Sequence, residues 1–365
     1  MTGNRKGSRV TAVQVARITD LDVYRILPDT ALRTVMERLN SAELLYKCLL
    51  VSDAHGRLLG TVTDGDIRRG ILRGVGLSDP VAQCMRDQPI VGRVGADAEN
   101  QEKLRDFVAH IAFLPVVDAN RMVREVIVWT QDRPDVIALV MAGGLGKRLG
   151  ERTRTRPKPL LPVGGKPILG HILDRVESAS IVQVYVSAYY LADQICEFVA
   201  GRRGSAAIEI LRETDPLGTA GAIGLLPDPM TRPFMVINGD ILTKLDFHAL
   251  REFHERHGKD ATIAVAQHEV TVPFGVVRTG PDGQFHGIDE KPTLTHFVAA
   301  GIYLLSPEYR SLVAAGEHLD MPVLLERGRS IGLQAGLFPI HEYWTDVGRP
   351  EDLETARLIE NAGRI

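Results

Sequence analysis

Residues 136–167 read VIALVMAGGLGKRLGERTRTRPKPLLPVGGKP. The first six form an unbroken apolar run of the length of a buried strand. They lead into a glycine-rich turn at 142–148 that carries two cations, Lys147 and Arg148. Glycines let backbone N–H groups approach an anion because no Cβ intervenes and positive φ costs little. Arginines, a lysine and prolines continue through 152–158, so the stretch predicts a strand followed by a phosphate-binding loop.

Spacing separates this turn from other glycine-rich loops. A P-loop needs Ser or Thr after G-K, but Arg148 follows Lys147, and Met141 stands where the first glycine belongs. A dinucleotide fingerprint, G-x-G-x-x-G, is disfavoured because the third glycine, Gly150, comes one residue late. The remaining alternative is a solvated basic loop that binds nothing.

The stretch resembles the signature of the sugar-1-phosphate nucleotidylyltransferases in its A-G-G-x-G-x-R-L turn and in the later P-K-P-L and K-P segments. The resemblance implies that the glycines line a nucleotide site and that two cations hold the nucleotide's phosphates. By motif match the catalytic cations are Arg148 and Lys158. The nucleotide-binding residues are Ala142, Gly143, Gly144 and Gly146. Many members have Thr where this chain has Lys147, which replaces a hydroxyl contact by a cation.

Further segments resemble the family's substrate contacts. The segment PLGTAGA at 216–222 implies nucleotide contacts, with helix capping by Thr219 as the alternative. The segments 273–277, 289–292 and 299–303 resemble those around the hexose, where carboxylates bind hydroxyls and ammonium groups pair with phosphate. A solvated Glu–Lys surface pair is the alternative there. The expected contacts are Gly218 and Thr219 for the nucleotide, and Gly275, Glu290, Lys291 and Gly301 for the sugar phosphate.

Two aspartates are candidate metal ligands. Asp240 follows the buried strand 234–238, and Asp346 lies in a segment, YWTDVG at 343–348, that also resembles the family. Mg²⁺ takes one or two protein carboxylates together with phosphate oxygens. The resemblance implies Mg²⁺ at Asp240 and Asp346. No covalent nucleophile is needed, because a phosphate oxygen is already ionised at neutral pH.

The composition of the 365 residues narrows the class of protein. A net charge of -3 argues against a general polyanion binder, so no nucleic-acid partner is expected. No apolar run approaches the roughly 20 residues of a membrane span, and the N-terminus lacks the apolar core of a signal peptide. Three cysteines without metal-ligand spacing disfavour a disulfide framework or a zinc site. We therefore expect a cytoplasmic protein without a membrane partner.

The chain before the glycine-rich stretch divides into three regions. Residues 1–17 are polar and basic and are expected to form a flexible end. Residues 18–75 and 76–131 each read as a small α/β module with a helix followed by two strands, which indicates an internal repeat. In the first module the strands are expected at 47–52 and 58–63, and the helix at 30–39 has one apolar face formed by Leu32, Val35, Met36 and Leu39. Polar residues and a helix-breaking proline at 131–134 mark the start of the domain 135–365.

The repeat resembles tandem CBS domains through the motif G-x-x-T-x-x-D at 60–66. This resemblance implies a regulatory adenosine nucleotide, AMP or ATP, whose phosphate meets Thr63 and whose ribose meets Asp66. A hydroxyl at a helix N-terminus suits that role, although ordinary helix capping by Thr63 is the alternative. The second repeat has no convincing match, so one site is expected rather than two.

Apolar strand patterns, among them 234–238 and 261–267, alternate with helical patterns, among them 220–226, through 135–365, as in βαβ units. We predict an α/β protein: a Rossmann-like nucleotidyltransferase domain with a mainly parallel sheet, preceded by an α/β tandem CBS (Bateman) module. The resemblance implies a homo-oligomeric enzyme that forms an NDP-sugar and pyrophosphate from an NTP and a sugar 1-phosphate.

The nucleobase is the least determined part of this prediction. The combination of motifs looks most like guanylyltransferases of surface-glycan pathways, so GTP and a GDP-sugar are expected, with CTP, UTP and dTTP left open. No residue identifies the sugar. A second hypothesis is a ligand sensor in which the CBS pair functions and the transferase fold is inactive. The intact set Arg148, Lys158, Asp240 and Asp346 favours the enzyme.

Overall fold

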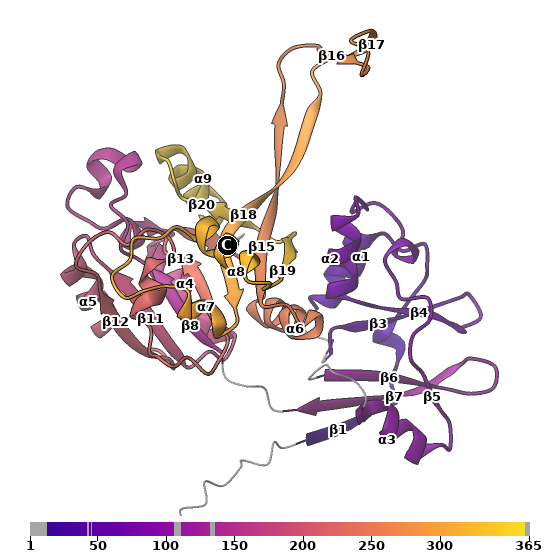
Figure 1. Ribbon diagram of the computed structural model, residues 1–365. Helices are drawn as coiled ribbons and strands as arrows, with labels where there is room; N and C mark the ends of the chain where they lie inside the picture. The colour runs from indigo at the N-terminus through magenta and orange to yellow at the C-terminus, as the bar shows by residue number, and fades with distance from the viewer. Residues whose placement is uncertain (1–12, 42–43, 45, 106–110, 132–135, 362–365) are drawn as a thin grey trace, which may run out of the picture. The chain divides into compact units, whose positions relative to one another are not determined.

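The computed structural model describes residues 13–41, 44, 46–105, 111–131 and 136–361 (Figure 1). The chain divides into two compact units, the first of residues 1–134 with 255–257 and the second of 135–254 with 258–365. Most of the expected flexible end, residues 1–12, lies outside the described residues, as does most of the expected linker, 132–134. Within the described part, no helix is both long enough and apolar enough to cross a lipid bilayer.

The first unit contains the same order of elements twice. The first copy consists of β2 (Arg25–Ile26), α1 (Leu32–Leu39), β3 (Cys48–Ser52) and β4 (Leu58–Thr63), followed by α2 (Asp64–Leu72). The second consists of β5 (Gly92–Arg93), α3 (Asp97–Arg105), β6 (Ile111–Val117) and β7 (Val123–Gln131). In each copy the first strand runs parallel to the second, which pairs antiparallel with the third. Two short 3-10 helices, η1 (Asp22–Tyr24) and η2 (Val81–Gln83), lie in the connections.

The strand β1 (Val13–Ile18) corrects the expectation of a flexible end through residue 17. It pairs antiparallel with β7, with Ala16 opposite Val128. Without β1, the edge of β7 would present a row of unpaired backbone groups. Along this strand Ala16 and Ile18 are half-buried, whereas Val15 and Arg17, on the other face, are exposed.

The second unit is built on a mixed sheet. Among the described residues its strand order is β12-β11-β8-β13-β18-β15-β19. The strands are β8 (Ile137–Met141), β11 (Gln183–Ala188), β12 (Ala207–Arg212), β13 (Phe234–Asn238), β15 (Ala261–Thr271), β18 (Thr293–Leu305) and β19 (Ala335–Ile340). Only β18 runs antiparallel to its neighbours, so the prediction of a mainly parallel sheet is confirmed.

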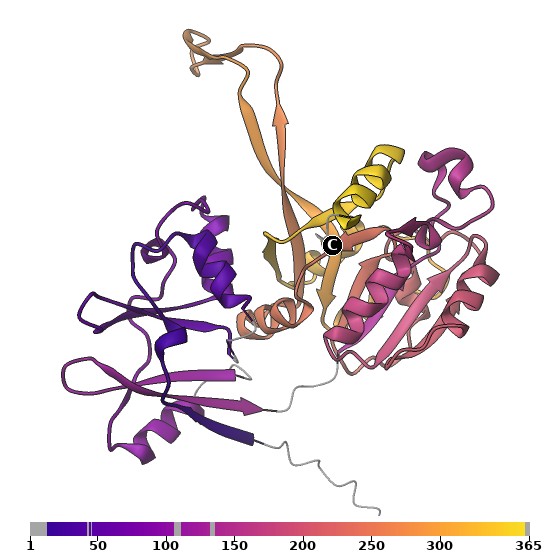
Figure 2. The ribbon, with the colours of Figure 1, turned by 180° about the vertical axis from the view of Figure 1, so that it is seen from behind.

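Helices pack on both faces of this sheet, which gives three layers (Figures 1 and 2). One face packs against α4 (Ile168–Ser178), α5 (Ala192–Ala200), α6 (Phe247–His257) and α9 (Pro350–Asn361). The other packs against η5 (Gly221–Leu225), α7 (Glu308–Ser311) and α8 (Met321–Ser330). The remaining elements are η3 (Lys147–Thr153), η4 (Lys158–Leu160), β9 (Pro162–Val163), β10 (Lys166–Pro167), β14 (Ile241–Thr243), β16 (Val276–Thr279), β17 (Phe285–Asp289) and β20 (Trp344–Asp346).

A buried arginine joins two connections on the second face. The Arg310 guanidinium donates hydrogen bonds to the carbonyl oxygens of Leu226 and Gly224, each at 2.9 Å, and of Val313 at 3.1 Å. Buried carbonyl groups without donors are costly, so one side chain satisfies three groups of otherwise irregular backbone.

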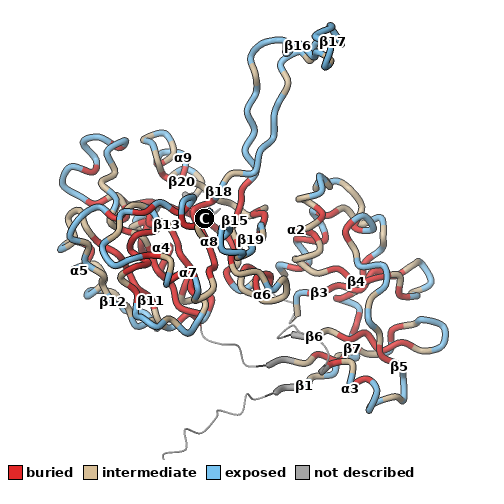
Figure 3. The backbone as a smooth tube through the Cα atoms, in the orientation of Figure 1, coloured by how far each residue is buried: buried red, intermediate tan, exposed pale blue. Residues whose placement is uncertain are grey.

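Strands β15 and β18 continue beyond the sheet as a two-stranded ribbon, residues 267–298, that we call the arm (Figures 1 and 2). The short pair β16 and β17 forms its tip. Exposure begins abruptly along β15, because Ala266 is buried whereas 267–271 are exposed (Figure 3). The arm was not anticipated from the sequence, which predicted a strand only over 261–267.

Candidate active site

A cavity of about 280 Å³ lies at the carboxyl ends of β8, β12 and β13. Ligands of α/β sheets usually bind at this edge, because loops there connect strands to helices on opposite faces. Six of the predicted site residues line the cavity: Gly143, Gly144, Lys158, Gly218, Thr219 and Asp240.

The glycine-rich loop is held in shape by a buried threonine. The Thr153 hydroxyl lies 3.0 Å from the carbonyl oxygen of Gly146 and 3.1 Å from that of Gly150. Gly146 has φ +63°, a left-handed conformation that favours glycine. A Cβ at this position would also lie 3.1 Å from Cβ of Lys158. The loop is therefore folded tightly against the residue that carries the predicted catalytic amine.

Lys158 lies between the two predicted metal ligands. Its amine donates a hydrogen bond to Oδ2 of Asp240, and its Nζ lies 3.7 Å from Oδ1 of Asp346. Strand pairing brings the carboxylates together, since Ile241 of β14 is opposite Asp346 of β20. The Val347 N–H also donates to the Asp240 carbonyl at 3.0 Å. The Lys158 ammonium group is thus shared by two aspartates that are 106 positions apart in the chain.

The shared site perturbs one of these carboxyl groups. Burial, reinforced by the neighbouring Asp240 carboxylate, raises the pKa of Asp346 to about 6, and Lys158 opposes the rise only in part. The Asp346 side chain is half-exposed and that of Asp240 is 25% exposed. A divalent cation would relieve the repulsion between them.

Two oxygens at this site have no donor. Within the described residues, Oδ1 of Asp240 and Oδ1 of Asn238 are buried without a hydrogen-bond partner. Buried polar atoms are normally paired, so unsatisfied oxygens beside a carboxylate pair fit a hard cation with oxygen ligands. The described residues contain no cluster of three or more His, Cys, Asp or Glu that could hold a metal ion.

The cavity wall opposite the glycine-rich loop contains Gly218 and Thr219 and is held by hydrogen bonds to a residue far away in sequence. Asp320, at the start of α8, accepts hydrogen bonds from the Thr219 N–H at 3.0 Å and hydroxyl at 3.2 Å. The Met321 N–H in turn donates to the Thr219 hydroxyl at 2.9 Å. Gly218 has φ +76°, and a Cβ there would lie 2.6 Å from the Leu319 carbonyl oxygen. Thr219 therefore does not cap a helix of its own segment but joins this wall to α8.

Other predicted residues lie outside the cavity lining. Ala142 is buried in the core, and Arg148 is exposed, with no hydrogen bond or ion pair to another described residue. Gly301 lies beside the site, because a Cβ there would be 2.7 Å from Nδ2 of Asn238.

The remaining sugar-phosphate residues, Gly275, Glu290 and Lys291, all lie on the arm. No hydrogen bond or ion pair between described residues joins them to the cavity. The structure thus places these three residues on the arm, whereas Gly301 lies beside the cavity. The physical reason is the continuous pairing of β15 with β18, which carries them away from the sheet.

Three residues that line the cavity with polar side chains were not predicted. Glu213 lies at the end of β12 and accepts a hydrogen bond from the Leu217 N–H at 3.2 Å, Asn238 ends β13, and His318 precedes α8. Glu213 and Asn238 each follow an apolar strand, and that position could have indicated them. No sequence pattern points to His318.

In the first unit, Thr63 and Asp66 bond to one another. The Thr63 hydroxyl and N–H both donate to Oδ2 of Asp66, at 2.7 and 2.8 Å, and the Asp66 N–H donates back to the hydroxyl at 3.4 Å. Arg69 also donates to Asp66. This is a capping box at the start of α2, so the capping alternative describes the structure without a ligand.

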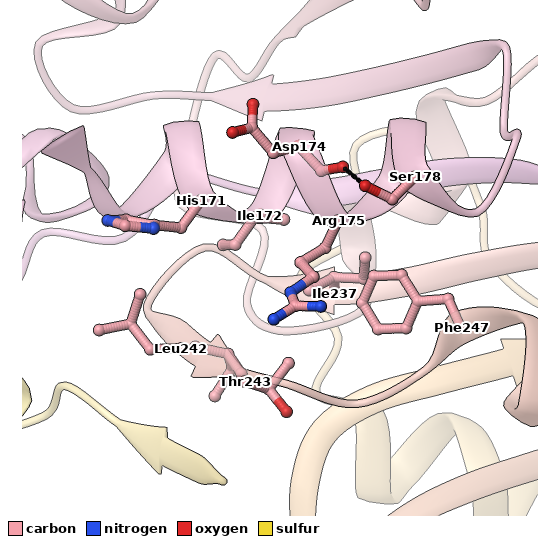
Figure 4. A pocket seen from close by; sticks show the side chains of 10 residues that line it. His171, Ile172, Asp174, Arg175, Ser178, Ile237, Leu242, Thr243 and Phe247 are labelled. Carbon is pink, nitrogen blue, oxygen red and sulfur yellow. Dashed lines mark hydrogen bonds between the residues drawn. The ribbon is translucent and has the colours of Figure 1, made fainter. Parts of the chain in front are cut away.

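A second cavity, of about 220 Å³, lies between α4 and the segment 241–247 (Figure 4). Its apolar lining includes Ile172, Ile237 and Phe247, and the Arg175 side chain reaches into it from α4. It contains none of the predicted site residues and is distinct from the cavity at Asp240.

The fold and the cavity define a class: an α/β protein with a glycine-rich loop and a lysine-bridged carboxylate pair at the carboxyl edge of a mainly parallel sheet. The chain belongs to the nucleotidyl transferase family, whose model matches residues 137–361. A CBS domain lies at the N-terminus, with the matching model covering residues 15–73. The families and the fold class predicted from the sequence are thus confirmed.

The chain is similar to mannose-1-phosphate guanylyltransferases. It is 31% identical over 233 residues to the catalytic subunit beta from Drosophila pseudoobscura pseudoobscura, covering 61% of this chain and 62% of that protein. It is 30% identical over 235 residues to mannose-1-phosphate guanyltransferase of Emericella nidulans, covering 61% and 63%. The chain thus spans under two thirds of the length of these relatives. A crystal structure of HddC from Yersinia pseudotuberculosis matches with a TM-score of 0.48 and 26% identity, over 61% of this chain and 98% of that one.

Proposed function

We propose that the second unit, residues 135–365, transfers a nucleotidyl group from an NTP to a sugar 1-phosphate in the presence of Mg²⁺, releasing pyrophosphate. The observation that carries this proposal is the arrangement of Lys158 with Asp240 and Asp346 at a glycine-lined cavity. GTP is the proposed nucleotide and mannose 1-phosphate the first sugar to test, because the similar proteins are named for that reaction. We place the reaction in the cytoplasm and in glycan biosynthesis.

In the proposed reaction, an ionised oxygen of the sugar 1-phosphate attacks the α-phosphorus of the NTP. The bond from the α-phosphorus to the bridging oxygen breaks, and pyrophosphate leaves with that electron pair. Asp240 and Asp346 would hold Mg²⁺, which supplies charge neutralisation between the two phosphate groups when bound. Two of its possible ligands, Oδ1 of Asp240 and Oδ1 of Asn238, are the oxygens without donors.

The protein's own groups would position the two substrates and neutralise the charge on their phosphates. The backbone of Gly143 and Gly144 offers close approach to the nucleotide, and Gly218 and Thr219 form the opposite wall. Lys158 would stabilise charge on the α-phosphate once the substrates compete with the carboxylates for its amine. Arg148, exposed and without a protein partner among the described residues, is free to pair with the departing pyrophosphate.

The experiment is a measurement of Mg²⁺-dependent pyrophosphate release with GTP, CTP, UTP or dTTP against a panel of sugar 1-phosphates. Asp240→Asn should lower turnover on the active pair by about 100-fold or more, with folding retained. Asp97→Asn is a matched control, because Asp97 also pairs with a cation, Arg17 at 2.8 Å, but lies in the first unit. Equal turnover by Asp240→Asn and wild type would refute the proposal.

We propose that the first unit regulates this activity by binding AMP or ATP at Thr63 and Asp66, with residues 18–75 and 76–131 as two CBS repeats. The CBS match over residues 15–73 supports the proposal. One carboxylate oxygen of Asp66 accepts from Thr63 in the capping box, and the other accepts from Arg69. A ligand that bonds to Asp66 without opening the capping box would therefore have to replace the Arg69 contact. Isothermal titration calorimetry with AMP and ATP tests it, and no heat of binding from either would refute it.

A further inference from the structure

The arm is a stiff continuation of the sheet. Pairing of β15 with β18 runs without interruption from Val265 opposite Ala299 to Thr271 opposite Thr293. The one register shift of this ladder lies between Ile263 and Val265, inside the buried part. Folding the arm back onto its own sheet would break several ladder hydrogen bonds, so the arm keeps its projecting course.

The arm exposes eight large apolar side chains. Two cross-strand pairs, Val270 with Leu294 and Val277 with Ile288, lie directly opposite one another. The exposed fraction reaches 73% at Phe274. The other large apolar side chains that are exposed on the arm are Val276, Phe285 and Phe297. A two-stranded ribbon is marginally stable in water on its own, and monomers rarely expose contiguous apolar patches above a few hundred Å².

The exposed area suits a contact between two copies of this chain. From typical side-chain areas, the eight apolar side chains together expose roughly 600 Å². Two arms buried reciprocally would remove about 1,200 Å² before the surfaces that they cover are counted, which reaches the range of stable interfaces. A twofold arrangement pairs the same surfaces on both copies and closes without leaving further arms exposed.

The arm also carries polar groups suited to a sugar phosphate. A Cβ on Gly275 would lie 3.1 Å from Oε2 of Glu290, so the glycine and the carboxylate are neighbours at the base of the tip. Lys291 follows in a left-handed conformation, with φ +47°. Such a conformation is strained for a lysine and is typical of functional positions. These groups lie on the arm, and the cavity they would serve lies at the sheet.

We propose that two copies of this chain exchange arms, and that Glu290 and Lys291 of each arm complete the sugar-phosphate side of the cavity in the other copy. The proposal rests on the proposed transferase function. It differs from a cavity completed within one chain, because each active site then requires both copies.

The first test is the mass of the full chain in solution by light scattering. Wild type should be a dimer or a multiple of one, and the double variant Phe274→Asp with Phe285→Asp should be a monomer. Val323→Asp is the matched control, because Val323 is 49% exposed but lies on α8, and this variant should remain dimeric. A wild-type protein with the mass of a monomer would overturn the proposal, whatever covers the apolar side chains of the arm in that monomer.

The second test is complementation between two inactive variants. Asp240→Asn keeps an intact arm, and Lys291→Ala keeps an intact cavity. Random pairing of equal amounts, obtained by co-expression with two tags, should restore about a quarter of wild-type pyrophosphate release, because half the dimers are mixed and each has one complete site. No recovery above the two parents would show that the arm acts within its own chain.

The two proposals fail separately. If wild type turns over no substrate pair, the transferase function fails, and light scattering of the arm variants still decides whether the arms join two copies. If wild type is active and Lys291→Ala retains full turnover with unchanged KM for the sugar 1-phosphate, the arm does not complete the site. The transferase function would stand in that case.

Discussion

The substitution Asp346→Asn should stabilise the protein in the absence of divalent cations. Asp346 is held beside Asp240, and burial with that neighbour raises its pKa from 3.8 to about 6. The folded state therefore binds the proton more tightly than the unfolded state, so ionised Asp346 lowers stability at every pH above about 6. The cost disappears as pH falls through the window from 6 to 3.8. Asparagine removes the charge and keeps the shape.

The size of the effect follows from the pKa. A rise from 3.8 to about 6 corresponds to roughly 3 kcal/mol for a fully shielded group. The Asp346 side chain is half-exposed, so solvent screening reduces this to the order of 1 kcal/mol. For a unit of this size, about 1 kcal/mol raises Tm by roughly 2–4 °C.

The assay is thermal unfolding followed by the fluorescence of Trp344, which lies two residues before Asp346 and donates to the Ala300 carbonyl at 2.9 Å. A Trp129→Phe background removes the other tryptophan, which lies in the first unit. With EDTA at pH 7.5 the asparagine variant should melt higher than its parent, and the two should converge near pH 4. Added Mg²⁺ should raise the Tm of the parent and leave the variant nearly unchanged. A variant that melts lower than its parent at pH 7.5 with EDTA would refute the reasoning.

Two further changes test other parts of the structure. Thr63→Ala removes the hydroxyl half of the capping box of α2, while the N–H of residue 63 can still donate to Asp66. The change should lower the stability of the first unit by about 1 kcal/mol, read from Trp129 in a Trp344→Phe background. An unchanged urea midpoint would show that the box contributes nothing. Arg310→Met leaves three buried carbonyl groups without a donor and should cost the second unit about 3 kcal/mol or more, measured by urea unfolding through Trp344. A loss below about 1 kcal/mol would mean that water replaces the guanidinium.

The local sequence pattern was sufficient to predict a helix or strand where the residues that it packs against are close in sequence. The strand Leu58–Thr63 has the predicted bounds, and α1 buries Leu32, Val35, Met36 and Leu39 at helical spacing, as expected. The segment 220–226 was expected to be an α-helix but forms the 3-10 helix η5. Glycines at 221 and 224 let its backbone approach the connection after α7, where a Cβ on Gly221 would lie 2.3 Å from the Glu317 carbonyl oxygen. Tertiary contact, which the local sequence does not encode, decided that geometry.

In the candidate site, too, some features could be predicted from the sequence and others depend on tertiary structure. Motif resemblance pointed to Lys158, Asp240 and Asp346, and the structure brings the three together. The position of Glu290 and Lys291 could not be deduced in this way, because it depends on how far the β15–β18 pairing extends past the sheet. A ribbon that continues straight and one that bends back have the same alternation of side chains. Only the register of the whole ladder distinguishes them.

The hydrogen bonds from Thr219 to Asp320 also set when the cavity can form during synthesis. The two residues are 101 positions apart, and ribosomes add roughly 5–20 residues per second, so the acceptor is made about 5–20 s after the wall that it fastens. During that interval the nascent chain can complete β8 and β13 with their glycine-rich loop, while Gly218 and Thr219 have no anchor. Nucleotide affinity should therefore arise late in translation, and a chain released before α8 should leave this wall of the cavity unformed.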